Sequence, residues 1–171
     1  VIIMEFIYSD GGRNNYFKAE HVGDCVTRAI CNATGKDYKE VYDRLKELAK
    51  LETDKQISRH RGHKRSSVRN GVFKETWKRY LAEIGWQQPL FTIPLPKFIK
   101  TFWAKMGPTV IENEPESAPK KTEPVPEKNE LPTDKIMIVQ VSKHLTCVKN
   151  GVLYDTYDCS RRGKRGVYGY W

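Results

Sequence analysis

The chain has 171 residues and a net charge of +9; 39% of its residues are hydrophobic and 30% are charged. This composition predicts one domain with an apolar core and a heavily ionised surface. No apolar run approaches the roughly 18–20 residues that cross a bilayer, so no membrane association is expected. The residues Val1–Glu5 do not resemble a signal peptide, and four irregularly spaced cysteines do not predict a disulfide scaffold. The expected location is therefore the cytoplasm.

The first predicted elements are an irregular or strand-like lead-in and one helix. The lead-in covers residues 5–20 and turns at Asp10–Gly12. The helix begins at Asp24, because apolar residues recur at helical spacing, and it ends at Gly35, where a left-handed cap is easiest for glycine. The apolar stripe consists of Val26, Ala29, Ile30 and Ala33.

A second helix is predicted over residues 37–52, where Asp37 and Glu40 form a start resembling a capping box. Residues 53–67 lack apolar periodicity and are interpreted as a basic loop, since no acidic residue occurs between Asp54 and Glu75. Three further elements are expected: a helix from residues 67–71 to Gly85, a helix over 94–107 and a short strand over 109–111.

Residues 112–135 are rich in proline and glutamate. Such a segment buries too little apolar surface to offset the entropy lost on ordering, which predicts a flexible insertion within the domain.

The last quarter of the chain predicts a sheet. Ile136–Val141 is an almost continuous apolar run, typical of a central strand. Two β-prone runs follow, His144–Lys149 and Val152–Tyr157, and Asn150-Gly151 between them is a strong hairpin signal. A final strand is expected within residues 166–171. Helices followed by antiparallel strands predict an α+β fold.

Cys25 is the first candidate for chemistry. The first turn of a helix has unpaired N–H groups and a partial positive charge, which lower the pKa of a thiol placed there. Cys25 also lies at the edge of the apolar stripe of its helix, which is a suitable place for a residue at the rim of a cleft.

A thiol nucleophile needs an imidazole within reach and a third group that orients the imidazole. If Asn150-Gly151 is a two-residue turn, His144 and Asp155 project from the same face of the sheet as diagonal neighbours. Cys25, His144 and Asp155 are therefore the candidate catalytic residues. Asp158 projects from the opposite face and is the reserve candidate for the third position.

These residues carry a resemblance. Gly23-Asp24-Cys25 opening a helix, a distant His144 and Asp155-Thr156-Tyr157 on the next strand resemble the Cys…His…Asn/Asp order of papain-like cysteine peptidases. The resemblance implies the papain-like fold and a thiol nucleophile. A closer similarity, over most of the chain except the insertion, is to small bacterial and bacteriophage proteins, which implies a bacterial cell or a phage-infected host. It rests on Asp10–Arg13, Gly23–Ile30, Tyr154–Asp158 and Val167–Trp171.

One feature departs from the papain-like pattern. Those enzymes usually place a glutamine shortly before the cysteine as an oxyanion donor, and no glutamine precedes Cys25. The backbone N–H of Cys25 is expected to be one donor, and Asn14, Asn15 and Asp24 are the candidate oxyanion and cleft residues. Loss of one donor typically costs about 10²–10³ in rate.

The sequence also bears on a metal site and on two alternative functions. The cysteines lack the spacing of a zinc site, so no metal is expected. The basic loop could grip phosphates weakly and non-specifically through Arg59, Arg61, Lys64 and Arg65, which makes nucleic-acid binding an alternative. A catalytically inactive papain-like scaffold that binds a partner is another.

The sequence thus predicts a single papain-like α+β domain over residues 1–171, with N-terminal helices packed on a C-terminal antiparallel sheet. The expected function is that of a cysteine peptidase or related thiol amidohydrolase. It would cleave a peptide or isopeptide bond in a peptide or protein substrate by acyl transfer, without a cofactor.

Overall fold

The computed structural model describes residues 5–18, 23–60, 62–88, 103 and 135–171. The fold is mixed α/β, with the helices in the N-terminal part and a five-stranded sheet built mainly from the C-terminal part. Among the helices described, none is both long and apolar enough to span a bilayer. The elements are β1 (Phe6–Tyr8), η1 (Arg13–Asn15), α1 (Cys25–Thr34), α2 (Tyr38–Lys50), α3 (Asp54–Ser58), α4 (Lys74–Glu83), β2 (Ile136–Val141), β3 (His144–Lys149), β4 (Val152–Asp155) and β5 (Val167–Tyr170).

The first two predicted helices are present, and local signals explain their limits. α1 ends at Gly35, whose φ of 70° is the left-handed conformation that glycine adopts without strain. α2 begins after Asp37, whose carboxylate accepts hydrogen bonds from the backbone N–H groups of Lys39 and Glu40.

Two predictions about residues 53–73 were wrong. The segment interpreted as a loop contains α3, which a capping box between Thr53 and Gln56 starts without apolar periodicity. The next helix, α4, begins at Lys74 rather than at residues 67–71. Ser67 and Gly71 form a β-bridge that closes a turn, and the φ of 132° at Gly71 is incompatible with a helix.

The sheet has the strand order β1-β4-β3-β2-β5. β2, β3, β4 and β5 pair in antiparallel fashion, and Val148 lies opposite Leu153 as the two-residue Asn150-Gly151 turn predicts. The sheet is not wholly antiparallel as expected, because the lead-in strand β1 pairs with β4 in parallel. A parallel partner needs a long connection, and here that connection contains all of the helices that the structure describes.

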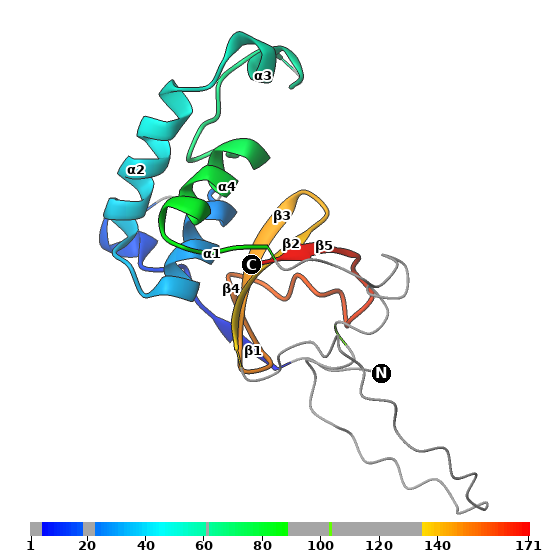
Figure 1. The fold of residues 1–171 in the computed structure, drawn as a ribbon. Helices are drawn as coiled ribbons and strands as arrows, with labels where there is room; N and C mark the ends of the chain where they lie inside the picture. The colour runs from blue at the N-terminus through cyan, green and yellow to red at the C-terminus, as the bar shows by residue number, and fades with distance from the viewer. Residues whose placement is uncertain (1–4, 19–22, 61, 89–102, 104–134) are drawn as a thin grey trace, which may run out of the picture.

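Apolar side chains cover both faces of the sheet. α1 packs on β3, and the helical layer of α1, α2 and α4 lies on one side of the sheet (Figure 1). Successive residues of a strand face opposite ways, so Ile138 and Leu145 join the core under the helices while Val139 and Val148 join a second core on the other face. Burial on both faces explains why β2 is almost continuously apolar.

Most of residues 89–134 lie outside the described part of the chain. The predicted helix over 94–107, the strand over 109–111 and the insertion over 112–135 fall there, apart from Trp103 and Lys135. Trp103 is fully buried in the second core, and its indole N–H donates to the carbonyl oxygen of Arg165 at 2.6 Å.

Candidate active site

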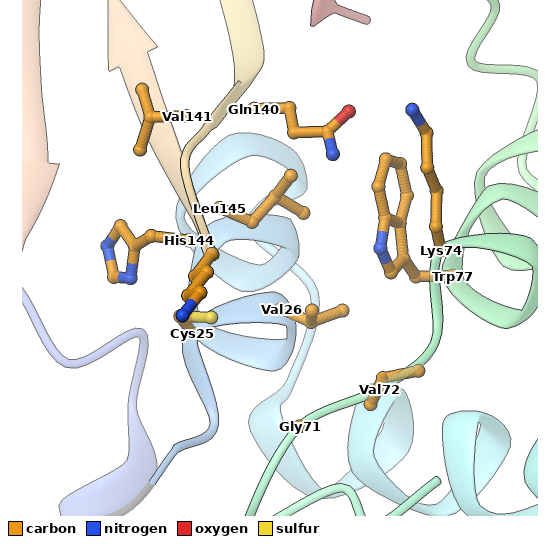
Figure 2. Close-up of a pocket in the computed structure, with 11 residues that line it drawn as sticks. Cys25, Val26, Gly71, Val72, Lys74, Trp77, Gln140, Val141, His144 and Leu145 are labelled. Carbon is orange, nitrogen blue, oxygen red and sulfur yellow. The ribbon is translucent and has the colours of Figure 1, made fainter. Parts of the chain in front are cut away.

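Cys25 is the first residue of α1, and His144 is the first residue of β3. Because α1 packs against β3, the start of the helix and the start of the strand come together. The sulfur and the imidazole lie beside each other at one end of a shared pocket (Figure 2). Of the four free cysteines, Cys25 is the one that is not buried, so it is the thiol that a substrate could reach.

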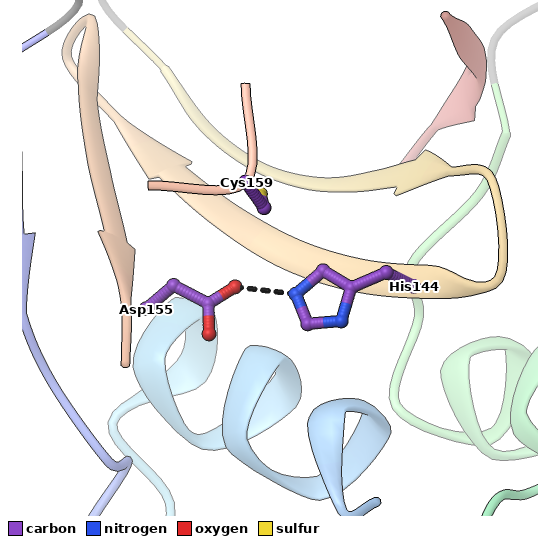
Figure 3. A group of neighbouring side chains, drawn as sticks. All are labelled: His144, Asp155 and Cys159. Carbon is purple, nitrogen blue, oxygen red and sulfur yellow. Dashed lines mark hydrogen bonds and ion pairs between the residues drawn. The ribbon is translucent and has the colours of Figure 1, made fainter. Parts of the chain in front are cut away.

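Asp155, the last residue of β4, holds the imidazole. Its Oδ2 atom lies 2.7 Å from Nε2 of His144, and the two side chains are only 3% and 7% exposed (Figure 3). The bond to Nε2 leaves Nδ1 as the ring nitrogen for Cys25. The ring of Tyr157 lies 5.2 Å from the imidazole, centre to centre.

The three groups shift each other's pKa values. Burial raises the pKa of Cys25, but hydrogen bonding to His144, its charge and the backbone of Leu145 outweigh this and lower the pKa below its usual value. Burial lowers the pKa of His144, whereas hydrogen bonds to Asp155, Cys159 and Cys25 raise it to about 12. The arrangement therefore favours a thiolate beside an imidazolium, which is the reactive form of a thiol nucleophile.

Asp155 stays ionised although it is buried. Burial raises its pKa, but the hydrogen bond and the charge of His144, together with the charge of Arg28, lower it on balance. Its second oxygen, Oδ1, accepts from Nη1 of Arg28 at 2.8 Å and from the backbone N–H of Thr156 at 2.7 Å. A carboxylate with this many donors is fixed in orientation, and so is the imidazole that it holds.

Arg28 extends the network back to the start of α1. Its side chain is 6% exposed, its Nε donates to Oδ1 of Asp24 at 2.9 Å, and its Nη1 also donates to the hydroxyl of Thr156 at 2.6 Å. Asp24 also accepts from the hydroxyl of Tyr38 at 2.6 Å and pairs with Arg13 at 3.7 Å. A chain of buried charges thus links the residue before Cys25 to the residue that holds His144.

The pocket that contains Cys25 has a volume of about 220 Å³. It lies between the start of α1, the segment before α4 and the β2–β3 turn (Figure 2). Its lining residues are Cys25, Val26, Gly71, Val72, Lys74, Trp77, Gln140, Val141, Lys143, His144 and Leu145.

Comparison of the chain with protein-family models, with curated proteins and with solved structures gave no match.

The other candidate residues of the cleft lie elsewhere. Asp24 is 1% exposed and faces the buried network, not the pocket. Asn14 and Asn15 are exposed in η1, and neither lines the pocket. The carboxylate of Asp158 accepts from the backbone N–H and the hydroxyl of Ser160, at 2.9 and 2.6 Å, so it is bonded away from His144.

Of the candidate polyanion-binding residues, Arg59, Lys64 and Arg65 do not line this pocket. Arg59 follows α3 and Lys64 is exposed, whereas Arg61 lies outside the described residues. The guanidinium of Arg65 donates to the carbonyl oxygens of Lys50 and Glu52, at the end of α2. Arg65 also lines a second pocket of about 280 Å³, together with Lys46 and Lys50.

Cys159 is a further neighbour of His144 and Asp155 that the sequence did not place beside them. Its sulfur and the ligand-type atoms of His144 and Asp155 all lie within 4.8 Å of one another (Figure 3). These are donor atoms that a transition metal accepts. However, Nε2 of His144 and Oδ2 of Asp155 are already bonded to each other, so an ion bound here would break the bond that orients the imidazole.

The sequence alone also did not indicate that Arg28, Lys74 and Lys143 lie near this site. The i,i+4 spacing of Asp24 and Arg28 is a sequence signal for their pairing. No local signal places Arg28 against Asp155, because that contact joins a helix to a strand 127 positions later.

Proposed function

We propose that this protein is a cysteine peptidase or related thiol amidohydrolase that cleaves a peptide or isopeptide bond by acyl transfer. The observation that carries the proposal is one accessible thiol at a helix start, beside a buried imidazole that is bonded at 2.7 Å to a buried carboxylate. Residues with a purely structural role do not need a thiol, an imidazole and a carboxylate side by side. A thiol nucleophile does need an acid–base partner beside it and a third group that orients that partner.

Acylation follows from the geometry. The thiolate of Cys25 attacks the carbonyl carbon, the C–S bond forms, and the carbonyl electrons move onto oxygen. The backbone N–H of Cys25 has no acceptor within its helix, so it is a donor for that oxyanion. As the intermediate collapses, the C–N bond breaks and the imidazolium of His144 gives its Nδ1 proton to the leaving amine, which leaves a thioester.

Deacylation uses the same groups in reverse. Neutral His144 takes a proton from water, and the resulting hydroxide attacks the thioester carbon. The C–S bond then breaks, the acid product leaves, and the thiolate–imidazolium pair is restored. Asp155 remains ionised throughout and holds the ring so that Nδ1 faces Cys25.

We also propose that the fold is papain-like. The support is the placement of the thiol at the start of a helix that packs on the sheet, while adjacent strands of that sheet carry the imidazole and the carboxylate. The four free cysteines fit a reducing compartment such as the cytoplasm.

The direct test is digestion of a complex peptide library, with cleavage products identified by mass spectrometry. The wild-type protein should cleave a defined subset of peptides, Cys25→Ala should abolish cleavage, and Cys31→Ala, which removes a buried thiol of the same helix, should retain it. Cleavage that survives in Cys25→Ala would contradict the proposal. A folded wild-type protein that cleaves nothing and whose Cys25 is no more reactive than its other thiols would favour a non-catalytic binding protein.

A second function, nucleic-acid binding, is favoured by the pocket that Lys46, Lys50 and Arg65 line. Three cations around one depression attract phosphate oxygens. If the protein binds nucleic acid there, affinity for a single-stranded oligonucleotide should fall steeply with salt, and Lys46→Gln with Lys50→Gln should weaken it. Binding that is unchanged in this double variant would exclude this pocket as the site.

A further inference from the structure

We propose that the pocket beside Cys25 selects a substrate residue that carries a carboxylate, so that the preferred cleavage site lies next to glutamate or aspartate. This inference rests on the proposed function, because it specifies the substrate of the same site. Three features of the pocket support it: its size, the positive charges at its rim and one buried acceptor in its wall.

The pocket is of a size for one side chain. Its volume of about 220 Å³ is smaller than the roughly 300–1,000 Å³ of pockets that enclose whole small molecules. One wall is apolar, since Val26, Val72 and Trp77 line it between α1 and α4. The methylene groups of a long side chain fit such a wall, and the end of that side chain would reach the polar groups at the rim.

Two lysines provide those polar groups. Lys74, from α4, and Lys143, from the β2–β3 turn, both line the pocket and are exposed. No acidic residue is among the lining residues, and within the described part of the chain neither ammonium forms an ion pair. The positive charge of Lys74 also acts on Lys78, one turn further along α4. Burial is the main cause that lowers the pKa of Lys78, and the charge of Lys74 is the second.

The local backbone does not favour a lysine at position 74 or at position 143. Lys143 has a φ of 54°, a left-handed conformation that glycine or asparagine would adopt at lower cost. Lys74 is the first residue of α4, where the helix dipole disfavours a cation and favours an acid. Both positions therefore place a positive charge beside the pocket against the local preference, and the helix start adds to the same positive potential.

Gln140 supplies the second recognition element. Its side chain extends from β2 toward Trp77 (Figure 2), and its Oε1 atom is buried with no hydrogen-bond donor among the described residues. A buried acceptor without a donor is unfavourable. Rotation of the side-chain amide would turn Oε1 toward the pocket, where a ligand N–H group would satisfy it. A peptide residue with an acidic side chain offers both groups that the pocket lacks, a backbone N–H for Gln140 and a carboxylate for the lysines.

The test uses matched peptides that differ at one residue next to the scissile position: glutamate, glutamine or lysine. Their affinity for the Cys25→Ala variant is measured by calorimetry, so the result does not depend on turnover. The glutamate peptide should bind about tenfold more tightly than the glutamine peptide, as two partly exposed ion pairs would produce, and the lysine peptide should bind most weakly. Equal affinity for glutamate and glutamine peptides would overturn the inference.

Variants of the two lysines test whether the preference for glutamate arises in this pocket. In Lys74→Gln with Lys143→Gln, the ratio of glutamate to glutamine affinity should fall close to one. Lys55→Gln, which removes an exposed charge from α3, should leave the ratio unchanged. A preference that survives the double variant would assign it to the general charge of the protein and overturn the pocket assignment. Raising the salt concentration should reduce the ratio for the same physical reason.

Gln140→Leu tests the acceptor separately. It should weaken the glutamate and glutamine peptides by the same factor and raise the thermal midpoint of the free protein, because it removes an unpaired buried oxygen. Unchanged peptide affinity would remove Gln140 from the inference. In all these measurements, selective binding without cleavage by the wild-type protein would refute the proposed function alone, and cleavage without carboxylate preference would refute this inference alone.

Discussion

Arg28 in the middle of α1 donates to the carboxylate of Asp155 at 2.8 Å, a contact across 127 positions of the sequence. The same guanidinium pairs with Asp24, the residue before the candidate nucleophile. One side chain therefore links the helix that carries Cys25 to the strand that carries Asp155.

Replacing Arg28 should destabilise the protein strongly. Arg28→Met leaves the buried carboxylates of Asp24 and Asp155 without their shared cation, and breaking a buried ion pair typically costs about 3–5 kcal/mol. The free energy of unfolding, measured with denaturant, checks this. Arg44→Met is the matched control, since Arg44 pairs with Glu47 and Glu83 on the surface, where a pair contributes about 0–1 kcal/mol. Equal losses for the two variants would show that the buried network has no special weight.

The rate of Cys25 alkylation should depend on pH in a defined direction. The imidazolium lowers the pKa of Cys25, so the rate should already be high at neutral pH and fall only as the pH drops through that lowered value. The pKa of His144 is raised to about 12, so the ion pair persists on the alkaline side of neutrality. Iodoacetamide labelling, followed by peptide mass spectrometry, measures the profile.

His144→Ala should move the midpoint of this profile upward. Without the imidazolium, burial is the largest remaining influence on Cys25, and burial raises the pKa of a thiol. The midpoint should then lie at or above the ordinary thiol value of about 8.5. An unchanged profile in this variant would mean that His144 does not activate Cys25.

Asp155 and Asp158 should differ sharply as third members of the site. Asp155→Asn removes the charge that supports the imidazolium, and turnover should fall by about 10²–10⁴-fold, the range of acid–base contributions. Asp158→Asn changes a carboxylate bonded to Ser160, and turnover should stay within a few-fold of wild type. Initial rates on one cleaved peptide decide the matter, and the reverse order of effects would assign the third position to Asp158.

Glu52 should stabilise the segment before α4, which includes Val72 in the wall of the Cys25 pocket. It is 5% exposed and accepts from Ser66 through both its backbone N–H and its hydroxyl, and from Thr76 at 2.5 Å. Glu52→Gln weakens these charge-assisted bonds and should cost about 1–3 kcal/mol in unfolding free energy. Hydrogen exchange should quicken around Val72 more than in β3. Uniform exchange changes would mean that Glu52 does not act locally.

Much of the fold was predictable because its signals are local. Gly35, the Asp37 cap and the Asn150-Gly151 turn fix the ends of α1, the start of α2 and the β3–β4 register within a few residues of chain. The turn register also predicts that His144 and Asp155 project from one face of the sheet, and the structure places their side chains 2.7 Å apart. α3 had a local signal as well, the Thr53 capping box, but it has no apolar stripe.

The remainder depended on contacts between distant segments. The parallel pairing of β1 with β4 and the burial of Arg28 against Asp155 follow from how the helical layer packs on the sheet. Lys74 and Lys143 lie 69 positions apart in the sequence and share a pocket only in the folded protein. Periodicity and turn chemistry carry no information about such pairs.

The thiolate of Cys25 can be measured without any substrate, as the ultraviolet absorbance of the wild-type protein minus that of Cys25→Ser, from about pH 4 to about pH 10. A thiolate–imidazolium pair predicts that this difference corresponds to one thiolate at pH values well below the ordinary thiol pKa, and that His144→Ala removes it there. A difference that appears only above about pH 8.5, in both proteins, would contradict the activation of Cys25 by His144.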